Sequence, residues 1–211
     1  MPFFTATSRF VQPGGMLNAV NDPMAGGVQN SVSGIQIARD PGQLGGFYYL
    51  TEAEASQRYG AQASPLYAGI YQYVQVVATS VAPAQGRAAC YSVLPTSYTN
   101  SLQNYIVTAT TTVENQSFFA GVFLNAITPG NFGWIQIAGV ATCQLIATLT
   151  GTTGIGAVVT LDPVGTTGKF DTALAAAQTT ALAKLNVGTA ITAAANGALI
   201  QVLLKGYDWN F

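Results

Sequence analysis

The chain has 211 residues, of which only 7% are charged, against roughly 25% in an ordinary soluble domain. Histidine is absent, which removes the side chain best suited to proton transfer near neutral pH and the commonest metal ligand. The formal net charge of −1 offers no basic patch for phosphate, so the composition argues against nucleic-acid binding. We therefore expect no catalytic residues, no metal or other cofactor, and no small-molecule substrate.

Charge is scarcest in the middle of the chain. Between Tyr59 and Leu161 the only Asp, Glu, Lys or Arg residues are Arg87 and Glu114. A soluble protein on its own normally stays dispersed because its surface carries mixed charges. Either much of this surface contacts partners, or uncharged polar side chains such as Thr, Ser, Gln and Asn solvate it.

The two cysteines, Cys90 and Cys143, each lie in an apolar stretch that is typical of a strand. We interpret them as small buried apolar residues, and their spacing leaves open whether they form a disulfide. The first ten residues lack the basic start and apolar core of a secretory signal, and no apolar run approaches the ~20 residues of a membrane helix. These features predict a cytoplasmic product, or a particle assembled in the cytoplasm, that does not bind membranes.

Residues 1–47 are rich in Gly, Pro, Asn and Gln, which favours turns and extended segments over a core. We interpret residues 1–60 as an extended arm or loop-rich lobe that orders against something else. Within it, Thr51 and Glu54 have the spacing of a capping box, which predicts a short helix that runs to about Tyr59 and stops at Gly60.

From Leu66 onward the sequence changes to short β-type segments separated by Gly and Pro. Many short strands at close spacing predict a mainly all-β fold, an antiparallel β-barrel or sandwich with one or two short helices, for residues 61–211. The expected strands are residues 71–77, 88–94, 105–113, 118–127, 132–137, 140–150, 157–161 and 198–205.

Residues 171–185 have the pattern of a helix near the end of this domain. Asp171 can cap its N-terminus, and Gly188 follows its C-terminus. Apolar residues recur at helical spacing. They are Leu174, Ala177, Ala181, Leu182 and Leu185.

Aromatic residues near the two ends of the chain are the candidate interface residues. They are Phe3, Phe4, Phe10, Tyr207, Trp209 and Phe211. Aromatic side chains add large contact area to an interface, although ordinary core packing explains each of them equally well. The alternation of the last three is also typical of the final strand of an outer-membrane β-barrel, but the charged outer loops of that class are missing.

The segment Phe118–Leu145 (FFAGVFLNAITPGNFGWIQIAGVATCQL) resembles a theme of tailed-bacteriophage capsid decoration, or cement, proteins and related virion structural proteins. A strand with a Gly-Val step leads through a Pro-Gly-Asn turn to an aromatic-Ile-Gln-Ile strand, then a Gly and a Val-Ala strand. The stretches 71–91 and 188–206 are similar to the opening and closing segments of such domains. The helix expected at 171–185 and the long N-terminal region depart from the minimal pattern.

This resemblance implies a β-barrel-like fold, a virion location and oligomers seated on a capsid lattice, with no catalytic residues. The expected function is that of a capsid decoration protein on the virion surface. Its expected partners are the major capsid protein and further copies of itself, as a homo-oligomer. The alternatives are another virion component, such as a tail, head-fibre or minor capsid protein, and, less favoured, an outer-membrane β-barrel or surface adhesin.

Overall fold

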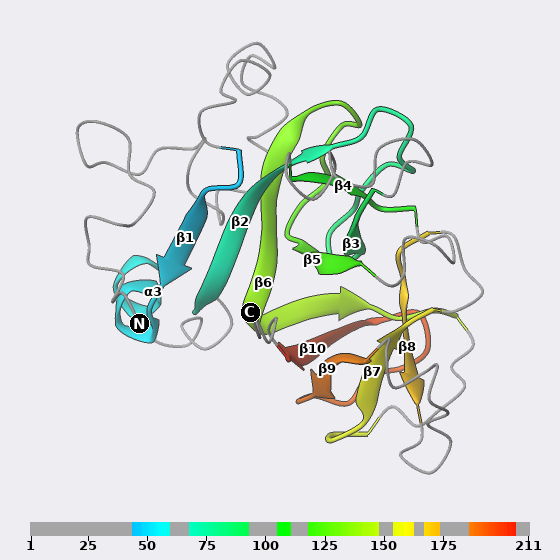
Figure 1. Ribbon diagram of the computed structural model, residues 1–211. Coiled ribbons are helices and arrows are strands. Elements are labelled where there is room, and N and C mark those ends of the chain that lie inside the picture. Colours follow the sequence, from blue (N-terminus) through cyan, green and yellow to red (C-terminus); the bar gives the residue numbers. More distant parts are fainter. Residues whose placement is uncertain are drawn as a thin grey trace.

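The computed structural model describes residues 44–59, 68–92, 105–110, 118–147, 154–162, 167–173 and 186–205 (Figure 1). These residues form ten strands and one short helix, which confirms the expected fold class. The elements are β1 (Phe47–Leu50), α3 (Glu52–Tyr59), β2 (Gly69–Val76), β3 (Ala88–Tyr91), β4 (Ile106–Thr108), β5 (Phe119–Phe123), β6 (Phe132–Gln144), β7 (Val158–Leu161), β8 (Phe170–Ala173), β9 (Asn186–Ala190) and β10 (Leu199–Leu204).

A closed five-stranded barrel forms one half of the molecule. β2 pairs with β4, β4 with β3, β3 with β5, β5 with β6, and β6 pairs back with β2. Four of these pairs are antiparallel as predicted, but β2 and β4 run parallel, with Gln75 opposite Ile106. Parallel neighbours cannot be joined by a tight turn, and here the chain passes through β3 between them.

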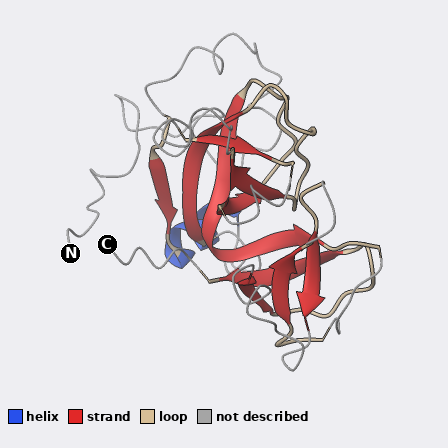
Figure 2. Cartoon of the chain, turned by 45° about the vertical axis from the view of Figure 1, so that its right-hand side comes forward, coloured by secondary structure: helices blue, strands red, loops and turns tan. Residues whose placement is uncertain are grey.

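The second half of the molecule, here called the second lobe, is a sheet that continues from the same long strand. The C-terminal part of β6, residues 139–144, pairs with β10, and the order continues through β9 and β7 to β8. The start of β8 lies beside the chain that follows β6, where the Ile146 N–H donates to the Phe170 carbonyl oxygen at 2.9 Å. Figure 2 shows the two groups of strands joined by the curved strand β6.

β6 turns from the barrel into the second lobe at a bulge. The pairing with β2 shifts by one residue here, so that Ile137 has no partner in the register. Gly139 follows with φ of 96°, a conformation that residues with a Cβ rarely adopt. The Gln136 side chain spans the bend, and its Nε2 donates to the carbonyl oxygens of Ala138 (3.3 Å) and Val140 (2.9 Å). The sequence predicted two strands separated at Gly139, whereas the structure has one continuous strand.

Three apolar clusters fill the spaces around these strands. The first lies inside the barrel and includes Val74, Val107 and Ile135. The second lies in the second lobe and also contacts the outer side of β3 and β5. β3 contributes to both of these clusters, because Cys90 belongs to the second cluster and Tyr91 to the first. Strands buried on both faces explain why the apolar residues of β3 do not alternate with polar ones.

The third cluster covers the outside of the barrel where β2 and β6 pair. β1 and α3 pack over this face, which is mainly aromatic. The helix begins at the predicted capping box: the Glu54 N–H donates to Thr51 Oγ1 at 3.2 Å, and the Thr51 N–H donates to Glu54 Oε2 at 3.2 Å. Residues 44–59, which lie in the predicted arm or lobe, therefore pack on the barrel. Residues 1–43 lie outside the described residues.

The predicted helix at 171–185 is wrong at its start. Residues 170–173 form strand β8, in which Asp171 lies opposite Thr160 of β7. The Asp171 carboxylate is buried and accepts a hydrogen bond from the Thr172 N–H at 2.7 Å, so it caps no helix. Burial of Phe170 in the second-lobe core overrides the local helical pattern. Residues 174–185 lie outside the described residues.

Candidate functional site

The predicted interface residues lie outside the part of the chain that the structure describes. They are Phe3, Phe4, Phe10, Tyr207, Trp209 and Phe211. Their role in contacts therefore stays a prediction. The described residues contain a different candidate surface, on the outer side of the second lobe.

This surface, here called the β10 face, consists of the outward-facing residues of four neighbouring strands. Its members are Val140, Thr142 and Gln144 of β6, Val158 of β7, Thr189 of β9, Ile191 just after β9, and Leu199, Gln201 and Leu203 of β10. The strand register aligns them in rows. Val140 lies opposite Leu203, which lies opposite Thr189, which in turn lies opposite Val158. The face is therefore a continuous surface across four strands.

β10 is apolar on both of its sides. Ile200, Val202 and Leu204 point into the core of the second lobe and are buried. On the opposite side, Leu199 is 49% exposed and Leu203 is 51% exposed. A strand with one side in water normally alternates apolar and polar residues, so exposed leucines at two alternate positions indicate a surface that contacts a partner.

The β10 face carries no charged side chain. Its polar members are Thr and Gln, which hydrogen-bond without charge. The next residue outward along β10 on the same side is Lys205, which is exposed at the rim of the face. A charge-depleted centre with a charged rim is the usual composition of a protein–protein interface.

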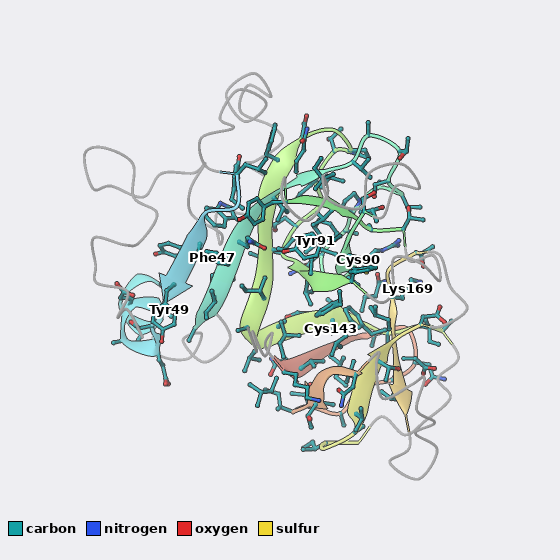
Figure 3. All side chains as sticks on the ribbon, in the orientation of Figure 1. Phe47, Tyr49, Cys90, Tyr91, Cys143 and Lys169 are labelled. Carbon is teal, nitrogen blue, oxygen red and sulfur yellow. The ribbon has the colours of Figure 1, made fainter. Side chains whose placement is uncertain are left out.

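The other exposed large apolar residues among the described ones are scattered. Tyr49 lies on β1, Val81 in the loop between β2 and β3, and Ile155 before β7. Figure 3 shows Phe47 and Tyr49 on β1, on the opposite side of the molecule from Lys169. Single exposed apolar residues are common on protein surfaces, so only the β10 face stands out as a patch.

The two cysteine thiols are free and buried (Figure 3). Burial raises the pKa of Cys90 from 9.0 to about 12 and raises the pKa of Cys143 as well. A thiol must ionise to act as a nucleophile or metal ligand, so both groups stay neutral and inert at physiological pH. Their interpretation as small buried apolar residues is confirmed.

The barrel interior contains a buried polar pair. The Tyr91 hydroxyl donates to Gln72 Oε1 at 3.0 Å, and both side chains are buried. Burial, followed by the effect of Tyr105, raises the pKa of Tyr91 to about 12, although the hydrogen bond to Gln72 acts in the opposite direction. The pair joins β2 to β3 across the barrel, and it has the character of a structural contact.

The described residues contain no candidate metal site and no candidate membrane-spanning helix. No group of three or more His, Cys, Asp or Glu residues lies close enough together there to hold a metal ion. In the same part of the chain, no helix is long and apolar enough to cross a membrane.

Comparisons with known proteins gave a likeness of fold to solved structures, but no match to a family or a curated protein. Among solved structures, the N base of head fibre gp8.5 of bacteriophage phi29 is similar, with a TM-score of 0.41 and 12% sequence identity. The match covers 64% of this chain and 92% of that chain. At this level the likeness concerns the arrangement of strands alone, and no conclusion about function follows from it.

Proposed function

We propose that this chain is a structural protein of a bacteriophage virion and, more narrowly, a capsid decoration protein that binds and stabilises the major capsid shell. The observation that carries the proposal is the β10 face, an uncharged surface with half-exposed leucines on a well-packed lobe. Such a surface is suited to permanent cover in an assembly. The proposed role needs no catalysis and no cofactor.

The resemblance of Phe118–Leu145 to capsid decoration proteins supports the narrower part of the proposal. In the structure this segment supplies β5, the turn before β6, and all of β6. It therefore includes the strand that joins the barrel to the second lobe. A protein that binds only the assembled lattice stabilises the shell by mass action, because each bound copy favours the state that presents its site.

In this proposal the N-terminal region makes the contact with the shell. Phe3, Phe4 and Phe10 provide aromatic anchors, and residues 1–43 precede the first described strand by enough chain to reach a neighbouring capsomer. The aromatic residues of the C-terminus, Tyr207, Trp209 and Phe211, are the second set of proposed anchors.

The test uses shells of the cognate major capsid protein that lack this chain. Full-length protein should co-sediment with the shells saturably and raise the temperature at which they fall apart. Deletion of residues 1–43 leaves Gly45 and β1 in place, so the variant should keep its β-sheet circular dichroism while losing at least tenfold in affinity. Replacement of Tyr207, Trp209 and Phe211 by Ser tests the other end of the chain in the same way.

Each result bears on a different part of the proposal. Undiminished binding by the deletion variant would show that the N-terminal region is not the anchor. Location on fibres or tails in electron micrographs of labelled virions would replace the decoration role with that of another virion component. Recovery of the protein in detergent-extracted envelopes, with none in particles, would overturn the virion assignment itself.

A further inference from the structure

We infer that the β10 face is the surface through which two copies of this chain associate, sheet against sheet, about a two-fold axis. The inference deepens the proposed function, on which it rests, because it assigns the contact between copies to named residues. It concerns the described residues alone.

The lack of charge on the face identifies the kind of partner. A charged side chain placed against Leu199, Leu203 and Ile191 would lose its water without gaining an opposite charge, which costs several kcal/mol. The partner must therefore present an uncharged surface of its own. A second copy of this chain meets the condition, because its β10 face is equally uncharged and is present at the same concentration.

The geometry of the face suits a sheet-on-sheet contact. Its rows run across four strands, and side chains from two facing sheets interdigitate when the sheets lie ~10 Å apart. Leu199 and Leu203 stand on either side of Gln201, so they form two ridges with a polar position between them. Around a two-fold axis near Gln201, the ridges of one copy meet the Thr and Val positions of the other, and the central glutamines meet each other.

The size of the face predicts how strong the contact is. Four strands ~4.8 Å apart and five residues that rise ~3.3 Å each give a footprint of about 14 by 17 Å. This is well below the ~800 Å² per partner of a standard stable interface. Two free copies should therefore associate only at high concentration. Copies that a shell already holds side by side would associate readily, since their effective concentration is far higher.

The first experiment measures self-association of the full-length chain by sedimentation velocity from low micromolar to millimolar concentration. The wild-type protein should shift from monomer to dimer as its concentration rises. Leu203→Glu should weaken the association at least tenfold, because it replaces an apolar ridge in each copy by a carboxylate that loses its water on contact. Val81→Glu is the matched control, since Val81 is 38% exposed in the loop between β2 and β3 and is not a member of the β10 face.

Two results would overturn the inference: a wild-type protein that stays monomeric throughout, or a dimer that Leu203→Glu leaves intact. Equal loss of the dimer in Val81→Glu would overturn it too, because the face would then have no special role. Circular dichroism should show that both variants keep the wild-type fold.

A second experiment detects the contact directly. Gln201→Cys puts a thiol at the centre of the face, and a short bis-maleimide should cross-link two copies through it. The native thiols Cys90 and Cys143 are buried and should not react. The same reagent should leave Val81→Cys monomeric. Absence of cross-linked dimer for Gln201→Cys at the highest concentration would contradict the proposed arrangement.

The two proposals can fail separately. A chain that dimerises through the β10 face but never enters particles would overturn the virion role and leave the dimer contact standing. A chain that decorates shells to full occupancy with Leu203→Glu, and shows no dimer in solution, would overturn the contact and leave the decoration role standing.

Discussion

The barrel and the second lobe differ in how their outer faces are covered. Outside the barrel, the face formed by β2 and β6 carries Tyr71, Tyr73, Phe132 and Trp134, and the chain covers it with β1 and α3. Outside the second lobe, no helix or strand among the described residues packs over the β10 face, and its two leucines are half exposed. Within the described residues, one apolar sheet face is therefore covered by further elements and the other carries exposed leucines.

The composition of the two faces explains this difference. The covered face is built from aromatic rings in contact: Tyr73 stacks on Phe132 with ring centroids 6.2 Å apart and lies 5.1 Å from Trp134. The open face mixes Leu and Val with Thr and Gln. A purely aromatic face in water would aggregate, whereas a mixed face tolerates both solvent and a partner. The open face therefore has the composition of a surface that is free before assembly and covered after it.

The largest effect should come from removing the central ring of the covered face. Trp134→Ala deletes a fully buried side chain and should lower the free energy of unfolding by about 3–5 kcal/mol. Leu203→Ala on the open face should change it by no more than about 0.5 kcal/mol, because little burial is lost in the free chain. Urea unfolding measures both. Similar losses in the two variants would show that the faces do not differ as described.

The junction between the two regions should be the next most sensitive place. A Cβ at Gly139 would overlap the Ala68 carbonyl oxygen and lie 2.9 Å from the Gly69 Cα, and its φ is 96°. Gly139→Ala should therefore lower the free energy of unfolding by about 2–4 kcal/mol.

Gly130 provides the control for that substitution. Its φ is 90°, but nothing lies within 4 Å of an added Cβ. Gly130→Ala adds backbone strain without a steric overlap, so it should lower the free energy of unfolding by about 1 kcal/mol in the same urea titration. If both variants lose the same amount, the close approach of β2 to the bend contributes nothing to stability.

An effect that appears only at alkaline pH concerns the core that the two regions share, which contains Cys90 from the barrel and Cys143 from the second lobe. Both thiols have a pKa above the ordinary value of 9.0 in the folded chain. Their stabilising contribution is therefore complete below pH 9 and is lost as the pH rises toward about 12, since the unfolded chain releases its protons first. The free energy of unfolding should fall by about 1.4 kcal/mol per pH unit for each thiol in that range.

Cys90→Ala isolates one of these contributions. Between pH 9 and about 12, the thiol-dependent fall in the free energy of unfolding per pH unit should be about half as large in this variant. An Ellman assay at pH 8 should detect no reactive thiol in either folded protein. A slope unchanged by the substitution, or rapid thiol reaction before unfolding, would contradict the burial of these residues.

The sequence predicted the strands that are flanked by turns. β5, β7 and β10 lie within the expected ranges, and the capping box located α3, because these signals are local. β1, β8 and β9 were missed: β1 follows a Gly-rich stretch that favours a loop, and β8 opens with residues that also fit a helix start. Such short strands are stabilised by distant neighbours, which periodicity within one segment does not reveal.

The candidate site was predicted less well than the fold. The sequence directed attention to aromatic residues near the termini, whereas the described surface is aliphatic and lies on β10. A signal was present in residues 198–205 (ALIQVLLK), which are apolar on both sides of the strand. That pattern fits a strand buried within its own chain as well as one covered by a partner, and only the sheet order distinguishes them.

The continuity of β6 makes the barrel and the second lobe a single folding unit. Its 13 residues belong to the barrel at one end and to the second lobe at the other, with a bulge and no loop between them. A break in the chain within β6 would therefore disrupt both sheets at once. The two regions should therefore unfold in a single cooperative step, and recombination should exchange them together, unlike modules joined by a linker.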